Sequence, residues 1–279
     1  MAVPDIGSKG VESMSADTRG DLHQHVLDAL GLDITAGRLA PGQVLSIDAL
    51  SEQLEVSRSV VREAIRVLTS MGLVQSRRRV GTVVRAASGW SLFDPTLIRW
   101  RLAGRDRLDQ LHALTELREA VEPMAARLAA ERADGQDRSE LVALAARLWE
   151  AGMSGEPERF LEIDVEFHDA LLRASGNPMF AQLGSTVTEI LAGRTRHGLV
   201  PAIPQQAALQ DHVDVATAIQ RGDADAASDA MNRIVRRSNE EMDELFREGD
   251  PEPTEPTDAP TPGTASSATE LPGDDRPLD

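Results

Sequence analysis

The sequence contains no cysteine and no tyrosine, and its aromatic content is only 3%. The absence of cysteine excludes a disulfide-stabilised scaffold and a cysteine zinc site, and it is typical of proteins of a reducing compartment. No apolar run approaches the ~18 residues that a membrane-spanning helix needs, and no signal-peptide pattern is present. We therefore expect a cytoplasmic protein that has no membrane partner.

Alanine and leucine are abundant, and 41% of the 279 residues are apolar. This composition favours helices packed on helices over a β-sandwich, and the length suits two domains. The formal net charge of −17 is unevenly distributed. Residues 248–279 carry nine acidic residues and one arginine, whereas residues 19–87 carry nine arginines and seven acidic residues. Overall acidity limits non-specific contact with DNA, but it leaves room for a local basic surface.

Residues 57–72 have the pattern of an amphipathic helix that carries a row of arginines. Ser57 stands at the N-cap position and Gly72 at the C-terminal glycine position. Such a helix can lay its N-terminal end in the major groove, where arginine recognises guanine and other guanidinium groups hold phosphates. The simpler alternative is a solvated amphipathic helix. The apolar side consists of Val60, Val61, Ala64, Ile65 and Leu68, and the other side shows Arg58, Arg62 and Arg66.

The neighbouring segments favour DNA binding. Residues 19–36 and 46–54 have helical apolar spacing, and a tight turn leads from the second segment into the arginine-bearing helix, which gives a helix-turn-helix. After Gly72 the periodicity changes to two, which predicts two strands over residues 73–76 and 82–84. Adjacent arginines on a turn are often only solvated, but beside a helix-turn-helix they can reach phosphate or the minor groove. The turn of this predicted wing carries Arg77, Arg78, Arg79 and Gly81.

We predict a mostly α fold, in which a winged helix-turn-helix of three helices and a two-stranded wing is joined to an all-α helical bundle. Six helices are expected in the bundle, one of them over residues 178–197, and its core can hold a ligand. The first of these helices has an apolar face of Leu111, Leu114, Leu117, Ala120, Val121 and Met124. The linker contains large apolar residues, including Trp90 and Trp100, and should be docked. The expected parts are a flexible N-terminal arm (1–18), the winged domain (19–87), the docked linker (88–105), the bundle (106–247) and a disordered acidic tail (248–279).

Within the predicted bundle, Asp164 and His168 lie one helical turn apart, and His212 lies on a later helix. A carboxylate and imidazoles suit Zn, Ni or Mn, provided that at least three ligands converge. The alternative is an Asp–His hydrogen bond on a helix surface. Arginine presents two parallel donors to a carboxylate, so arginines of the bundle would suit an anionic effector, although a surface ion pair is the alternative for each. The candidates are Arg118, Arg194 and Arg196.

The N-terminal motifs resemble the winged-helix domain of the GntR family of bacterial transcriptional regulators. They are LAPGQVL at 39–45, LSEQL at 50–54, VSRSVVREAI at 56–65 and GLV at 72–74. The resemblance implies base and phosphate contacts by Ser57, Arg58, Ser59 and Arg62, and wing contacts by Arg78, Arg79 and Gly81. Asp48 stands where some members have a phosphate-binding arginine, and we expect it to cap its helix instead.

The C-terminal motifs are similar to the FCD effector domain of the FadR subfamily. They include LREAVE at 117–122, Asp164-x-x-Phe-His168, SGN at 175–177, Asp211-His212 and AIQRGD at 218–223. Many members of this subfamily hold a divalent metal with one aspartate and three histidines. Asp164, His168 and His212 match three of these ligands, but Ile234 stands at the fourth position. Water or the effector would then complete the coordination shell, and His197 is a candidate replacement.

The layout of the linker, Trp90…Leu-Phe-Asp-Pro…Trp100, is similar to that of the family members that respond to sugar acids such as galactonate or gluconate. This resemblance implies a carboxylate effector, and Asn177 of the SGN motif joins the three arginines as a candidate contact.

We therefore predict a ligand-responsive repressor of a catabolic operon, which binds a palindromic operator as a homodimer and is not an enzyme. The alternative is a metal-dependent hydrolase with a DNA-binding appendage, because an open three-ligand site is also a catalytic pattern. An enzyme should add a general base or nucleophile beside the metal, and the sequence offers no recognisable one.

Overall fold

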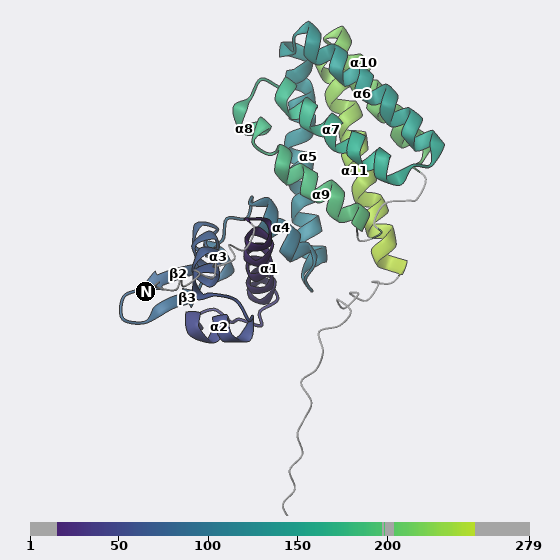
Figure 1. The fold of residues 1–279 in the computed structure, drawn as a ribbon. Coiled ribbons are helices and arrows are strands. Elements are labelled where there is room, and N and C mark those ends of the chain that lie inside the picture. The colour runs from purple at the N-terminus through teal and green to yellow at the C-terminus, as the bar shows by residue number, and fades with distance from the viewer. Residues whose placement is uncertain (1–15, 197, 199–203, 249–279) are drawn as a thin grey trace, which may run out of the picture.

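The computed structural model describes residues 16–196, 198 and 204–248. Figure 1 shows a small N-terminal domain with a β-hairpin beside a larger bundle of long helices, and helix α4 lies where the two meet. Most of the predicted arm and nearly all of the predicted acidic tail lie outside the described residues. Within the described part of the chain, no helix is long and apolar enough to cross a membrane.

The N-terminal domain contains the predicted helix-turn-helix. Helix α1 spans Ala16–Thr35, α2 spans Ile47–Gln53 and α3 spans Arg58–Ser70. Ser46 and Ser57 are the N-caps of α2 and α3, since their side chains accept the backbone N–H groups of Ala49 and Val60. The apolar side of α3 predicted from the sequence is buried against α1. This buried side turns the arginines of α3 outward.

Gly72 ends α3 in the conformation that its position predicts. Its φ of +81° lies in the left-handed region, which glycine adopts without steric cost. The N–H of Gly72 donates to the carbonyl of Thr69, and the N–H of Leu73 donates to that of Leu68 at 2.9 Å. These two bonds satisfy carbonyls at the helix end and turn the chain directly into the wing.

The wing contains the two predicted strands and one that was not predicted. Strands β2 (Val74–Arg77) and β3 (Gly81–Val84) pair antiparallel, with Arg77 opposite Gly81. Strand β1 (Val44–Leu45) pairs with the other edge of β3, so the sheet order is β1-β3-β2. The predicted two-stranded wing is therefore a three-stranded sheet. β1 escaped prediction because two residues are too few to show a periodicity.

The segment expected to be a docked linker contains a 3-10 turn, Ala87–Gly89, and helix α4, Pro95–Leu102. Leu97 and Trp100 of α4 belong to the core of the winged domain, whereas Ile98 and Leu102 pack with Leu111 of the bundle. Helix α4 therefore has one side in each domain.

The contact between α4 and α1 is close. The indole Nε1–H of Trp100 donates to Asp28 Oδ1 at 2.8 Å. A Cβ placed on Gly31 would lie only 2.5 Å from the Trp100 ring, so this crossing requires glycine. On the other side of α4, Arg99 pairs with Glu189 of the bundle at 3.2 Å.

The bundle is helical throughout its described part. Its helices are α5 (Arg107–Arg132), α6 (Gly135–Ser154), α7 (Pro157–Ala174), α8 (Pro178–Ala181), α9 (Gly184–Arg196), α10 (Gln206–Arg221) and α11 (Ala224–Glu248). The prediction of one helix over 178–197 is wrong, because α8 ends at Ala181 and a separate helix, α9, begins at Gly184. A Cβ at Gly184 would lie 2.2 Å from Asp169 Oδ1, so α9 begins where its backbone packs closely on α7.

The buried face of α5 also differs from the prediction. The sequence suggested an apolar face that included Ala120 and Met124, but both are exposed, and Met124 is 46% exposed. Arg118 and Glu122 point inward instead and are 1% and 0% exposed. The pair can be buried because each side chain neutralises and hydrogen-bonds the other.

Candidate functional site

The candidate DNA-binding residues of α3 lie at its exposed N-terminal end. The Arg58 side chain is 64% exposed, and its Nε lies 2.9 Å from Asp48 Oδ1 of α2. The expectation that Asp48 caps its helix is wrong, because Ser46 is the cap and Asp48 pairs with Arg58. The hydroxyls of Ser57 and Ser59 are 2.8 Å apart. These groups form one polar surface beside the N-terminus of α3.

Further along α3, Arg62 is exposed, and Arg66 pairs with Glu63 at 2.6 Å. The wing carries its candidates at its tip. Arg77 ends β2, and Arg78 and Arg79 form the turn, where all three are exposed. Arg79 has a φ of +67°, an uncommon conformation for a residue with a Cβ. The chain thus presents cations from two elements, α3 and the wing.

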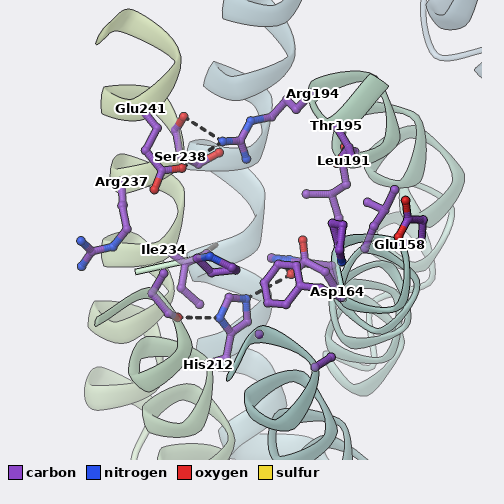
Figure 2. A pocket seen from close by; sticks show the side chains of 18 of the residues that line it. Glu158, Asp164, Leu191, Arg194, Thr195, His212, Ile234, Arg237, Ser238 and Glu241 are labelled. Atoms are coloured by element: carbon purple, nitrogen blue, oxygen red, sulfur yellow. Dashed lines mark hydrogen bonds and ion pairs between the residues drawn. The ribbon is translucent and has the colours of Figure 1, made fainter. Parts of the chain in front are cut away.

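The bundle contains a cavity of about 330 Å³, at the small end of the range for ligand pockets. Its wall comes from α5, α6, α7, α9, α10 and α11 (Figure 2). The three candidate metal ligands line this cavity, together with Arg118, Arg194 and Ile234.

The three candidate ligands converge. One ligand atom from each of Asp164, His168 and His212 lies within 4.8 Å of the others. The Nε2 atoms of His168 and His212 lie 3.5 and 3.2 Å from the same oxygen, Asp164 Oδ1. Asp164 and His168 come from successive turns of α7, and His212 comes from α10, as their sequence positions predict. The wall at the expected fourth position is the hydrocarbon side chain of Ile234.

The Nδ1 atoms of both imidazoles face oxygen atoms on the side away from Asp164. His212 Nδ1 lies 2.8 Å from the carbonyl oxygen of Ala208, which can only accept, so Nδ1 carries the proton. Its other nitrogen, Nε2, faces Asp164 Oδ1 at 3.2 Å. His168 Nδ1 lies 3.1 Å from Glu122 Oε2. Outer partners of this kind orient the histidine ligands of metal sites.

Arg118 and His168, which line the cavity, belong to a buried network of charged side chains that also includes Glu122. Arg118 donates to both oxygens of Glu122, at 2.9 and 3.1 Å, and its Nη2 lies 3.4 Å from His168 Nε2. Burial alone would raise the pKa of Glu122, but the charges of Arg118 and His168 outweigh it and lower this pKa to about 2. Glu122 is therefore ionised at neutral pH.

The same network affects the two metal-ligand candidates on α7. Burial opposes the charged form of His168, but Glu122 and Asp164 outweigh this effect and raise its pKa to about 9. Burial also opposes ionisation of Asp164, yet hydrogen bonds from the two histidines hold the pKa of Asp164 below its usual range. Without a metal, His168 is therefore protonated at neutral pH, and a divalent cation would have to displace that proton.

The cavity also contains a second buried arginine. Arg194 is 6% exposed, and its Nη2 donates to the carbonyl of Ser238 at 3.2 Å and lies 3.4 Å from Glu241 Oε2. Burial and the nearby charge of Arg118 lower the pKa of Arg194 to about 10. Within the described part of the chain, Arg118 Nη1 has no hydrogen-bond partner.

Two of the four candidate effector contacts lie elsewhere. Arg196 is exposed and pairs with Glu189 at 3.0 Å, and Asn177 caps α8 by accepting the N–H of Met179. Neither residue lines the cavity. The candidate ligand His197 falls outside the described residues.

Sequence reasoning missed several cavity residues. Glu122 was assigned to no site, although it follows Arg118 by one helical turn and such pairs are a recognisable signal. Arg237, Ser238 and Glu241 of α11 line the cavity and follow Ile234 at helical spacing. The position expected for a fourth ligand could therefore have identified them.

Comparisons with known proteins place both halves of the chain. The profile described as "Bacterial regulatory proteins, gntR family" matches residues 22–84, and the FCD domain profile matches residues 113–237. The galactonate operon transcriptional repressor of Escherichia coli K12 is 30% identical over 224 residues, which cover 79% of this chain and 96% of that protein. A putative L-lactate dehydrogenase operon regulatory protein of the same organism is 32% identical over 218 residues, or 75% of this chain and 82% of that protein.

The solved structure of Lar, described as controlling the Listeria monocytogenes agr system, is 18% identical and has a TM-score of 0.50. The match covers 80% of this chain and 97% of the Lar chain, which shows the shared fold. These relatives are named as regulators, and none supports the alternative of a hydrolase.

Proposed function

The chain belongs to the GntR family of bacterial regulatory proteins and carries an FCD domain, and on that premise we propose that its cavity binds a small carboxylate that controls the affinity of the winged domain for DNA. The protein is a DNA-binding transcriptional regulator and not an enzyme. The observation that carries the proposal is the buried cavity, where Arg118 Nη1 has no partner among the described residues and three possible metal ligands meet.

The DNA contacts proposed are Ser57, Arg58, Ser59, Arg62 and Arg66 on α3 and Arg77, Arg78, Arg79 and Gly81 on the wing. Their exposure and the two-element arrangement of cations support this assignment. The protein would repress a catabolic operon as a homodimer on a palindromic operator, because one recognition helix covers only a half-site.

We assign a divalent metal, Zn, Ni or Mn, to Asp164, His168 and His212. Two observations support the fit: both Nε2 atoms face Asp164 Oδ1, and the Nδ1 atoms of His212 and His168 lie 2.8 Å from Ala208 O and 3.1 Å from Glu122 Oε2. The bound cation would supply an open coordination position for a carboxylate oxygen. Arg118 and Arg194 would pair with the remaining charge of the effector.

The names of the relatives support an acid as effector. One is named for a galactonate operon and another for an L-lactate dehydrogenase operon, and both galactonate and lactate are carboxylates. A ligand can switch DNA affinity only through its different affinity for the two arrangements of the protein, so the acid must favour one placement of the winged domains.

The metal assignment is tested by calorimetric titration of the chelator-treated full-length protein with Zn²⁺ and Ni²⁺. We expect saturable binding of one ion per chain, which the double variant Asp164→Ala with His168→Ala abolishes. Ile234→His should tighten binding by supplying the fourth ligand. If elemental analysis of the purified protein finds no metal and Zn²⁺ does not bind, the cavity uses arginines and polar groups alone.

A further inference from the structure

The wall of the cavity has polar groups on two opposite sides and is mainly hydrocarbon between them, where Thr195 and Glu158 also line it. Figure 2 shows Arg194, Ser238 and Glu241 on one side of the space and Asp164 and His212 on the opposite side. Ile234 of α11 and Leu191 of α9 face the space between these polar groups. The hydrocarbon part of the wall comprises Ile234, Leu191, Phe160, Leu161 and Ala208.

This wall is a poor match for a polyhydroxylated acid. A sugar acid carries a hydroxyl on nearly every carbon, and each hydroxyl that is buried without a hydrogen-bond partner loses its bonds to water without replacement. Ile234, Leu191 and Phe160 can neither donate nor accept. Arg237, which also lines the cavity, already donates to Asp211 at 3.1 Å.

The cavity offers buried hydrogen-bond donors that suit one anionic group. Arg118 is 1% exposed, and its Nη1 has no hydrogen-bond partner among the residues described. The Oγ of Ser238, a residue that is 7% exposed, is likewise without a partner there. The charges of Arg118 and Arg194 repel each other, so a carboxylate beside them would relieve this repulsion.

Resting on the proposed effector function, we propose that the cavity selects a monocarboxylate with a hydrocarbon body over a polyhydroxylated sugar acid. The carboxylate would lie at the polar groups around Arg118, and the body would pack on Ile234 and Leu191. Ile234 is the residue that sets this preference, since it places a branched hydrocarbon where a polar ligand was expected. It is 8% exposed and lines the cavity.

The test compares hexanoate with gluconate, which have the same number of carbons and one carboxylate each. Thermal unfolding of the full-length protein is titrated with each acid, once in EDTA and once with Zn²⁺, so that a metal requirement cannot hide binding. We expect half-saturation by hexanoate at a concentration at least about tenfold lower than by gluconate. Ile234→Asn should narrow or reverse this ratio, whereas the matched variant Ile234→Val keeps the hydrocarbon wall and should preserve it.

Two results would overturn the inference alone: tighter binding of gluconate by the wild-type protein, or an unchanged preference for hexanoate in Ile234→Asn. Failure of the proposed carboxylate cavity would look different. Neither acid would then shift the melting temperature of any variant, under either metal condition, while circular dichroism still showed folded protein. That result would overturn this inference together with the effector assignment, and it would leave the assignment of the winged domain intact.

Discussion

At the scale of single residues, α3 and the wing should contribute to DNA binding in different ways. Arg58 projects from the N-terminal end of α3, where it can reach base edges. We expect Arg58→Ala to weaken operator binding by about 1–3 kcal/mol and to relax the choice of base at one position in each half-site. Arg79→Ala on the wing should weaken all sequences alike and flatten the dependence of affinity on salt.

Gel retardation on a duplex selected in vitro by the wild-type protein measures both effects. Arg147→Ala is the matched control, because Arg147 is an exposed arginine of α6 that pairs with Glu166, far along the chain from the winged domain. If Arg58→Ala binds the selected duplex as tightly as the wild type, α3 is not the helix that recognises bases.

The buried pair of Arg118 and Glu122 leads to a prediction on stability. Glu122→Gln keeps the shape of the side chain but removes the charge that compensates Arg118 and faces His168. Leaving a buried charge uncompensated is expected to lower the free energy of unfolding by about 3–5 kcal/mol. Urea denaturation measures this difference.

The control is Glu119→Gln on the exposed side of α5, which should change the free energy of unfolding by less than about 0.5 kcal/mol. Similar midpoints for Glu122→Gln and the wild type would mean that the Arg118–Glu122 pair is solvated.

The chemistry of individual side chains explains which site residues could be predicted. Asp164 and His168 could be predicted because a carboxylate and an imidazole one helical turn apart have few common uses beyond ligation or a hydrogen bond, and the resemblance to the FCD domain added His212. Glu122 was missed because glutamates are seldom fully buried, and only the partner on the preceding turn makes this one possible. Burial is a property of the assembled bundle and not of α5 alone.

At the scale of elements, the crossing of α1 and α4 should tolerate no added methyl group. Gly31→Ala places a Cβ against the ring of Trp100 and must move α4 or the indole. We expect overpacking to lower the free energy of unfolding by about 1–3 kcal/mol. Thermal and urea unfolding of the full-length protein would measure this loss of stability.

Gly135→Ala is the matched control, because a Cβ at this helical position meets nothing within 4 Å. There the substitution should stabilise the protein slightly, by up to about 1 kcal/mol. Equal effects of the two substitutions would show that the α1–α4 crossing is loosely packed.

The elements that could be predicted are those whose first and last residues are marked by capping residues in the sequence. Helix α3 has a serine cap, an apolar side and a terminal glycine within its own sequence, so its bounds follow locally. β1 has two residues and exists only because β3 offers it an edge. The break between α8 and α9 coincides with the close approach of Gly184 to Asp169, a contact across helices that no local pattern encodes.

At the scale of the whole molecule, a palindromic operator has two half-sites, and each half-site needs one recognition helix, so two protomers are required. We expect a two-fold dimer at micromolar concentration and an operator of two inverted half-sites about 34 Å apart, or a multiple of this distance. Sedimentation equilibrium and the stoichiometry of the DNA complex measure this. A monomer with intact DNA binding and one protein per operator would contradict the expectation.

The indole of Trp100 has a further consequence for the whole molecule, and it is optical. Trp100 is 3% exposed, and its Nε1–H is bonded to Asp28 of the winged domain, while Leu102 on the same helix is packed in the bundle. Any rearrangement that shifts α4 against α1 would alter the surroundings of this ring, and therefore its fluorescence. Replacing Trp90 and Trp149 by phenylalanine would leave Trp100 as the sole tryptophan of the sequence. Its emission would then follow, without any label, whether a ligand in the bundle moves the domain that binds DNA.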